Sequence, residues 1–138
     1  MRYLLDVNIL VAWGWVDHLD HERTVHWLAS VKRQKESVLM TSPIPELGFI
    51  RVSVQRTQGH VTVMEASETL AGMVESLGSR HLFLSDDSSA TDLPEWCRHA
   101  SRTTDAHLVR LADAHEAKLA TLDAGITGAL LIPTLPDK

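Results

Sequence analysis

The sequence predicts an α/β domain built on a parallel β-sheet. Short apolar runs recur along its 138 residues, and stretches with a helical spacing of apolar residues separate them. A parallel strand is covered on both faces and therefore looks like a continuous apolar run, and successive parallel strands need a crossover, which is usually a helix. No internal repeat, low-complexity tract or linker interrupts the alternation, so we expect a single domain over residues 1–138.

Four or five apolar runs predict the strands of this sheet. The first run carries a carboxylate, Asp6, at its end, although a charged side chain is seldom buried without a partner or a metal. The second run is ended by Pro43. In order along the chain, the predicted strands are residues 2–6, 38–41, 81–85, 119–123 and, as a possible fifth, 130–134.

Helices are predicted between these strands from capping residues and apolar spacing. Asn8 is expected to cap a helix that runs to about residue 15, and Asp17 or Asp20 is expected to begin the next helix. Another helix is expected after the second strand, where the spacing i, i+3, i+7 is provided by Leu47, Ile50 and Val54.

The second half of the chain continues the pattern. Residues 63–77 are the clearest amphipathic stretch, and Thr104 is expected to cap a helix that runs to about residue 118. Residues 85–96 are the only long loop, with a short helix expected from Pro94. A turn with another short helix is expected over residues 124–130.

The composition is typical of a cytoplasmic protein and does not exclude a nuclease. A formal charge of −5, from 13 basic and 18 acidic residues, argues against coating nucleic acid through bulk charge. Four carboxylates committed to a metal would leave 13 basic residues against 14 acidic ones, which is close to neutral. The single cysteine allows no internal disulfide, and no apolar run has the length of a membrane span, so we expect no membrane contact.

Four acidic residues stand apart from the others by position. Asp6 and Asp123 end predicted strands, and Glu46 and Asp105 lie in the first turns of predicted helices. In a parallel sheet these positions share the edge at which ligands bind. Any one of them alone fits an acid that favours a helix N-terminus. Four at one edge favour a common site.

A shared carboxylate site needs a cation, because clustered carboxylates repel one another and would otherwise take up protons. Ligand sets made only of oxygen select Mg²⁺ or Mn²⁺ rather than Zn²⁺. Such a site activates water for attack on a phosphodiester. The four acids therefore indicate a metal-dependent hydrolase.

Three stretches carry a resemblance to a known family. They are LLDVNILVAW (4–13), PIPELGFIRV (43–52) and TTDAHLVRLADAHEAKLATLD (103–123). In order and spacing they resemble the acidic motifs of the PIN-domain nucleases, in particular the VapC-type ribonuclease toxins of type II toxin–antitoxin pairs. The resemblance implies a single PIN-like domain with a central parallel sheet flanked by helices. It also implies an endoribonuclease that hydrolyses RNA with water activated by Mg²⁺ or Mn²⁺.

The resemblance also implies roles for particular residues. The catalytic metal ligands would be Asp6, Glu46, Asp105 and Asp123. Asn8 and Thr121 would orient those ligands. The implied partners are an RNA substrate, a cognate antitoxin protein and a second copy of the chain in a homodimer.

Basic residues near Asp105 are candidates for contacts with the RNA backbone. Arg98, Arg102 and Arg110 fit this role as well as they fit a solvated surface, and Arg51 and Arg56 are weaker candidates. The acidic loop, residues 85–92 (SDDSSATD), is unfavourable for RNA binding and leaves the substrate-binding surface open.

Other functions compete with the toxin. A PIN nuclease outside any toxin pair could process RNA or cut structured DNA, and a catalytically silent protein-binding module could retain the acidic pocket. A phosphoacceptor receiver domain also places an aspartate at a strand end, but it would need acids before Asp6 and a lysine after a later strand, which this chain lacks.

Two further groups of residues remain open to interpretation. His18, His21 and His26 lie close together, but a closed zinc site needs four ligands and there is only one cysteine. The indole rings of Trp13, Trp15 and Trp27 fit either core packing or an apolar groove for the antitoxin.

Overall fold

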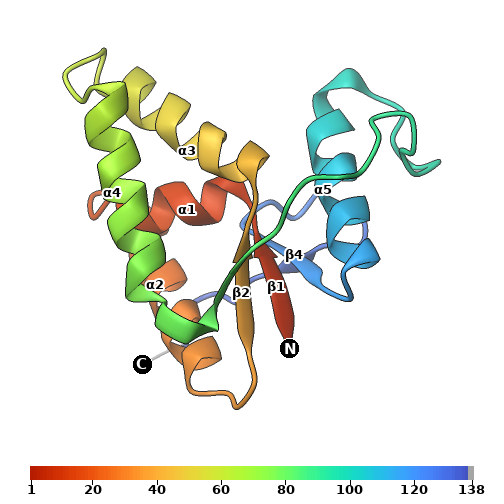
Figure 1. Ribbon diagram of the computed structural model, residues 1–138, viewed down its shortest axis with the longest axis horizontal. Helices are drawn as coiled ribbons and strands as arrows, with labels where there is room; N and C mark the ends of the chain where they lie inside the picture. The colour runs from red at the N-terminus through yellow and green to blue at the C-terminus, as the bar shows by residue number, and fades with distance from the viewer. Residues whose placement is uncertain (137–138) are drawn as a thin grey trace.

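A five-stranded parallel sheet forms the centre of the computed structural model, which describes residues 1–136 (Figure 1). The strand order is β3-β2-β1-β4-β5, and each neighbouring pair is parallel. The strands are β1 (Arg2–Leu5), β2 (Val38–Thr41), β3 (His81–Phe83), β4 (Lys118–Thr121) and β5 (Leu130–Leu131). The fold class and all five strand positions predicted from the apolar runs are confirmed.

Five helices and two short 3-10 turns connect the strands. The helices are α1 (Val7–Gly14), α2 (His21–Lys32), α3 (Pro43–Arg56), α4 (Val63–Ser76) and α5 (Thr103–Ala114). The 3-10 turns are η1 (Gly78–Arg80) and η2 (Ala100–Arg102). Within residues 1–136, no helix has the length and apolar character required to cross a membrane.

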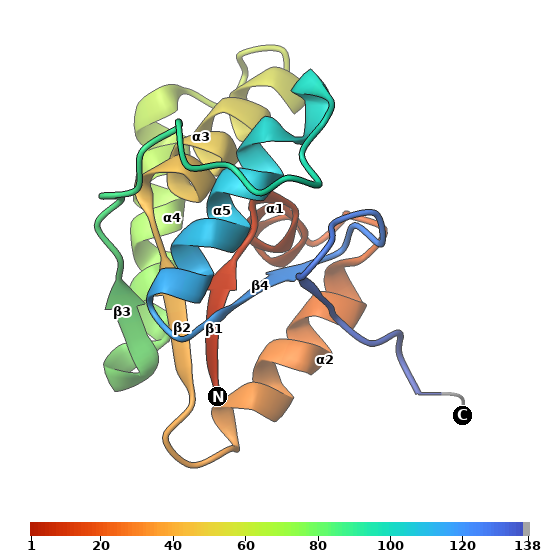
Figure 2. The same ribbon diagram turned by 90° about the vertical axis from the view of Figure 1, so that its right-hand side faces the viewer.

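The sheet separates two hydrophobic clusters. Helix α5 covers one face, and α1 to α4 cover the other (Figures 1 and 2). Side chains alternate along each strand, so Leu4 packs with α5 whereas Leu5 packs with the other helices. Trp27 is buried in the cluster between the sheet and α1 to α4. Its ring lies edge-on to the ring of Tyr3, with 5.2 Å between the ring centroids.

Two predicted helix caps are wrong. Asp6, not Asn8, caps α1, because the chain turns into the helix directly after β1 and the Asp6 carboxylate accepts a hydrogen bond from the Val7 amide. Thr104 lies inside α5 rather than at its start, because η2 leads straight into the helix and Thr103 already has helical dihedral angles.

Three other local predictions also fail. The buried face of α3 contains Gly48 and Phe49, whereas Leu47 is 62% exposed. Pro94 begins only a turn, closed by a bond from the Cys97 amide to its carbonyl, and residues 124–130 form turns without a helix. Local spacing selects a helix face poorly where two helices cross closely, as α3 and α1 do.

Gly48 makes that close crossing possible. A Cβ atom at residue 48 would lie 2.6 Å from Cγ2 of Val7, on the first turn of α1. Val7 follows Asp6 directly, so the α1–α3 contact fixes the position of the first carboxylate. A Cβ atom added at Gly72, in the middle of α4, would have no atom of another element within 4 Å among residues 1–136.

Gly48→Ala should lower the free energy of unfolding by about 1–3 kcal/mol, the usual cost of overpacking. Urea denaturation measures this change. Gly72→Ala is the matched control and should raise the free energy of unfolding by about 0.5–1 kcal/mol, because alanine favours a helix interior. Equal effects of the two substitutions would contradict the close α1–α3 contact.

Candidate active site

A cleft of about 350 Å³ opens at the carboxyl edge of the sheet. Its lining residues come largely from α1, α3 and α5, and Figure 1 shows α3 and α5 on opposite sides of the central strands. This is the edge at which ligands bind in parallel sheets. The residues that line it are Asp6, Val7, Asn8, Val11, His18, Arg51, Val52, Thr104, Asp105 and Asp123. Three of the four predicted acids therefore share one cleft.

Asp6 is the most buried of these acids, with 5% of its surface exposed. Oδ1 accepts a hydrogen bond from the Val7 amide at 2.8 Å, and Oδ2 accepts one from the Thr121 hydroxyl at 2.8 Å. Burial raises the pKa of Asp6, the two hydrogen bonds oppose this, and the charges of Asp105 and Asp123 raise it further. Burial therefore outweighs the two hydrogen bonds in its effect on the pKa of Asp6.

Asn8 and Thr121 hold Asp6 in place. The Asn8 amide nitrogen donates to the Thr121 hydroxyl at 3.0 Å, and its amide oxygen accepts from the Leu122 backbone at 3.1 Å. The Thr121 hydroxyl also accepts from the Asp123 amide at 3.1 Å. Because this hydroxyl accepts twice, its own proton is directed at Asp6. This geometry suits the orienting role expected of both residues.

Asp105 and Asp123 share a guanidinium group. Nη1 of Arg102 lies 2.8 Å from Oδ2 of Asp123 and 3.2 Å from Oδ2 of Asp105. The Gly125 amide donates to Oδ1 of Asp123 at 2.8 Å. The Gly125 bond and then Arg102 lower the pKa of Asp123, so this carboxylate is ionised under conditions where Asp6 is less readily so.

Glu46 lies outside this cluster. Its Oε2 accepts a hydrogen bond from the Thr41 hydroxyl at 2.8 Å, and that hydroxyl is 2.7 Å from Nε2 of His81. Thr41 shares the sheet face of Leu39, toward α1 to α4, whereas Thr121, which holds Asp6, shares the α5 face of Leu119. Because side chains alternate between the two faces along each strand, the Thr41 partner of Glu46 and the Thr121 partner of Asp6 lie on opposite faces of the sheet. Burial lowers the pKa of His81, and the charge of Glu46 opposes this.

The donor chemistry of the cleft fits a hard divalent cation. Within residues 1–136, no three acidic, histidine or cysteine side chains converge closely enough to ligate one ion. However, Asp6, Asp105 and Asp123 offer only oxygen donors, which suits Mg²⁺ or Mn²⁺. The raised pKa of Asp6 is the effect that a bound cation would reverse.

The histidines predicted as a weak zinc candidate are used otherwise. Nδ1 of His18 accepts a hydrogen bond from the Asp20 amide, and Nδ1 of His21 lies 2.8 Å from the Ala12 carbonyl oxygen. His18 instead lines the cleft. Sequence reasoning missed this placement, because no local pattern predicts which face the loop after α1 presents.

Most of the basic candidates for RNA contacts have acidic partners. Arg110 lies 3.7 Å from Asp92, and Arg56 lies 3.2 Å from Asp17. Arg98 is exposed, and Arg51 lines the cleft. Neither forms an ion pair with the part of the chain that the structure describes. Arg51, considered the weaker candidate from sequence, is therefore the better placed.

The acidic loop packs along α5. Three of its carboxylates face basic side chains, two on α5 and one on the residue that follows it. Asp86 faces His107 at 2.7 Å, Asp92 faces Arg110 at 3.7 Å, and Asp87 faces His115 at 3.8 Å. The loop therefore places carboxylates beside α5, and one of them pairs with the Arg110 guanidinium group.

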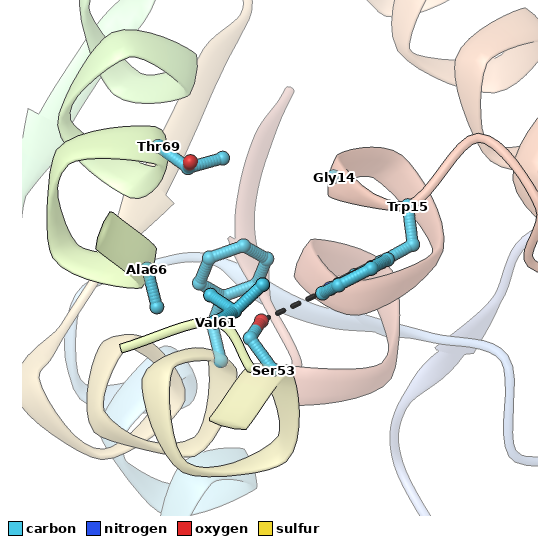
Figure 3. Close-up of a pocket in the computed structure, with 7 residues that line it drawn as sticks. Gly14, Trp15, Ser53, Val61, Ala66 and Thr69 are labelled. Atoms are coloured by element: carbon cyan, nitrogen blue, oxygen red, sulfur yellow. Dashed lines mark hydrogen bonds between the residues drawn. The ribbon is translucent and has the colours of Figure 1, made fainter. Parts of the chain in front are cut away.

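A second hollow lies between α1, α3 and α4 (Figure 3). Its lining, which includes Gly14, Phe49 and Val61, contains no ionisable side chain. The Trp15 indole donates to Ser53 at 3.0 Å, and Arg56 lies over its ring. Of the three tryptophans considered for an antitoxin groove, Trp27 belongs to the core, and Trp13 and Trp15 are partly buried against that core. The hollow offers no group for phosphodiester chemistry.

Comparison with known proteins identifies the family. No family model matches the chain. Ribonuclease VapC39 of Mycobacterium tuberculosis is 35% identical over 133 residues, which cover 91% of each chain. Ribonuclease VapC29 of the same organism is 30% identical over 141 residues, covering 97% of this chain and 98% of its own.

A solved structure shares the fold. The crystal structure of Mycobacterium tuberculosis VapC20, described as a toxin that cleaves the sarcin–ricin loop, superposes with a TM-score of 0.66 at 19% identity. The match covers 94% of this chain and 98% of VapC20. With a cleft of carboxylates at the sheet edge and relatives that match over nearly their whole length, the chain belongs to the VapC family of PIN-domain ribonucleases, the toxins of toxin–antitoxin systems.

Proposed function

We propose that this endoribonuclease depends on Mg²⁺ or Mn²⁺ and that Asp6, Asp105 and Asp123 hold the cation. The observation that carries the proposal is the buried Asp6 carboxylate, which shares a cleft with two other acids and has its pKa raised partly by their charges. Glu46 is left out of the ligand set, because its carboxylate is bonded to Thr41.

The residues of the cleft divide the work. Thr121 and Asn8 fix the orientation of Asp6, and the Gly125 amide fixes that of Asp123. A bound divalent cation supplies Lewis-acid activation of water and neutralises phosphate charge. Arg51 of α3, across the cleft from Asp105 of α5, would receive the RNA backbone, and His18 also lines the cleft.

Partners follow from the family. We propose an RNA substrate, a cognate antitoxin that blocks cleavage, and a homodimer as the working state. Mixing the purified chain with the antitoxin encoded beside it, and measuring mass by light scattering, tests the last two proposals together.

Asp6→Asn should reduce cleavage of a mixed RNA pool in Mn²⁺ by at least about 100-fold, since even the outer partners of metal ligands are worth about 10- to 100-fold. EDTA should abolish the wild-type activity. Glu46→Gln is the matched comparison and should retain cleavage, because a glutamine oxygen can still accept from Thr41. Equal losses in the two variants would return Glu46 to the ligand set.

The burial of Asp6 also predicts how stability depends on pH. Its pKa is raised above the ordinary value of 3.8, so the folded chain keeps this proton to higher pH than the unfolded chain. The contribution to the free energy of unfolding is present below that value and is lost as pH rises through the folded pKa. In EDTA, the free energy of unfolding of the wild type relative to Asp6→Asn should therefore fall as the pH rises above the ordinary value of 3.8 and through the folded pKa.

Urea denaturation at several pH values measures this difference. Asp113→Asn, at an exposed position on α5, serves as the control substitution. Parallel pH profiles for the wild type and Asp6→Asn would show that the raised pKa is not a property of Asp6. Adding Mn²⁺ at pH 7 should raise the melting temperature of the wild type and leave that of Asp6→Asn nearly unchanged.

Arg51→Gln and Arg98→Gln should each weaken binding of single-stranded RNA and reduce the salt slope by about 0.7, the value for one lost phosphate contact. Fluorescence anisotropy in EDTA measures binding without cleavage. Arg33→Gln removes the same charge at the exposed C-terminal end of α2 and is the control. If all three variants bind alike, RNA follows another path.

A further inference from the structure

Arg102 is positioned inside the carboxylate cluster rather than beside it. A single nitrogen, Nη1, is shared between Oδ2 of Asp123 and Oδ2 of Asp105, at 2.8 and 3.2 Å. The side chain extends from the end of η2, and 32% of it is exposed. Within residues 1–136, no other basic side chain forms an ion pair with either acid.

Gly125 provides the space that the guanidinium group occupies. A Cβ atom at this position would overlap Nη2 of Arg102 and would lie 3.2 Å from its Cζ. The backbone at Gly125 does not have a positive φ, so an alanine here meets no backbone strain. Glycine at this position therefore leaves the space into which the Arg102 guanidinium group fits.

The guanidinium group and a cation need the same oxygen atoms. Oδ1 of Asp123 is already bonded to the Gly125 amide, and Oδ2 is bonded to Arg102. Three carboxylates against one guanidinium leave two negative charges in the cleft, which still attract a divalent ion. That ion gains full access to Asp105 and Asp123 only when Arg102 moves away, and the exposure of its side chain allows this movement.

We propose that Arg102 is a built-in counter-ion that competes with the divalent cation for Asp105 and Asp123 and so weakens the affinity of the site for metal. The proposal rests on the metal site proposed above. Its alternative is a purely structural role, in which the i, i+3 pair with Asp105 stabilises the start of α5. A structural role would change the stability of the protein and leave metal affinity unaltered.

Calorimetric titration of the full chain with Mn²⁺ at pH 7 measures the affinity for the ion and so separates the two roles. Arg102→Met removes the charge and should tighten Mn²⁺ binding by about three- to tenfold, the equivalent of one or two partly exposed ion pairs. Gly125→Ala keeps every charge but displaces the guanidinium group, and it should tighten binding in the same direction. Arg110→Gln removes one positive charge from the pair with Asp92 and should change the affinity by less than about twofold.

Each outcome decides between the proposals. Equal or weaker Mn²⁺ binding by Arg102→Met, with measurable binding by the wild type, would overturn the competition and leave the metal site standing. Tightening of equal size in Arg110→Gln would also overturn it, because a general change of charge would then account for the effect. If neither the wild type nor Arg102→Met binds Mn²⁺, the metal site itself fails and the competition fails with it.

Discussion

The structure of the site depends on one costly arrangement, a carboxylate buried where a central strand becomes a helix. The backbone of Asp6 pairs with Ala120 of β4, and its side chain caps α1 and accepts the hydroxyl proton of Thr121. One residue therefore joins β1, β4 and α1. The two hydrogen bonds only partly offset the burial of the charge, since the pKa of Asp6 remains raised. A cation bound as proposed above would offset the remaining cost of burying this charge.

The protein stabilises the charges of Asp123 and Asp6 to different extents. The charge of Asp123 is stabilised by the protein, because the Gly125 amide and Arg102 both form hydrogen bonds with its carboxylate. Within residues 1–136, no basic side chain is a hydrogen-bond partner of Asp6. The positive charge that the chain supplies therefore reaches the outer acids and not the innermost one.

The sequence was sufficient for the sheet and for most of the cleft. Apolar runs located all five strands, and the rule that ligands bind at the carboxyl edge brought Asp6, Asp105 and Asp123 together. Two departures from the expected arrangement depend on packing between elements that are distant in sequence. Glu46 faces Thr41 and His81 because of the sheet face on which Thr41 lies, and the buried side of α3 is decided by Val7 on another helix. Arg102 lies three residues before Asp105, a spacing that local rules can find, but its bond to Asp123 spans 21 residues.

The contacts between the acidic loop and α5 make the cleft electrostatically lopsided. A polyanion that approaches it meets Arg51 on the wall formed by α3 and the carboxylates of the loop beside α5. Attraction to Arg51 and repulsion from those carboxylates would both favour a strand that enters along α3.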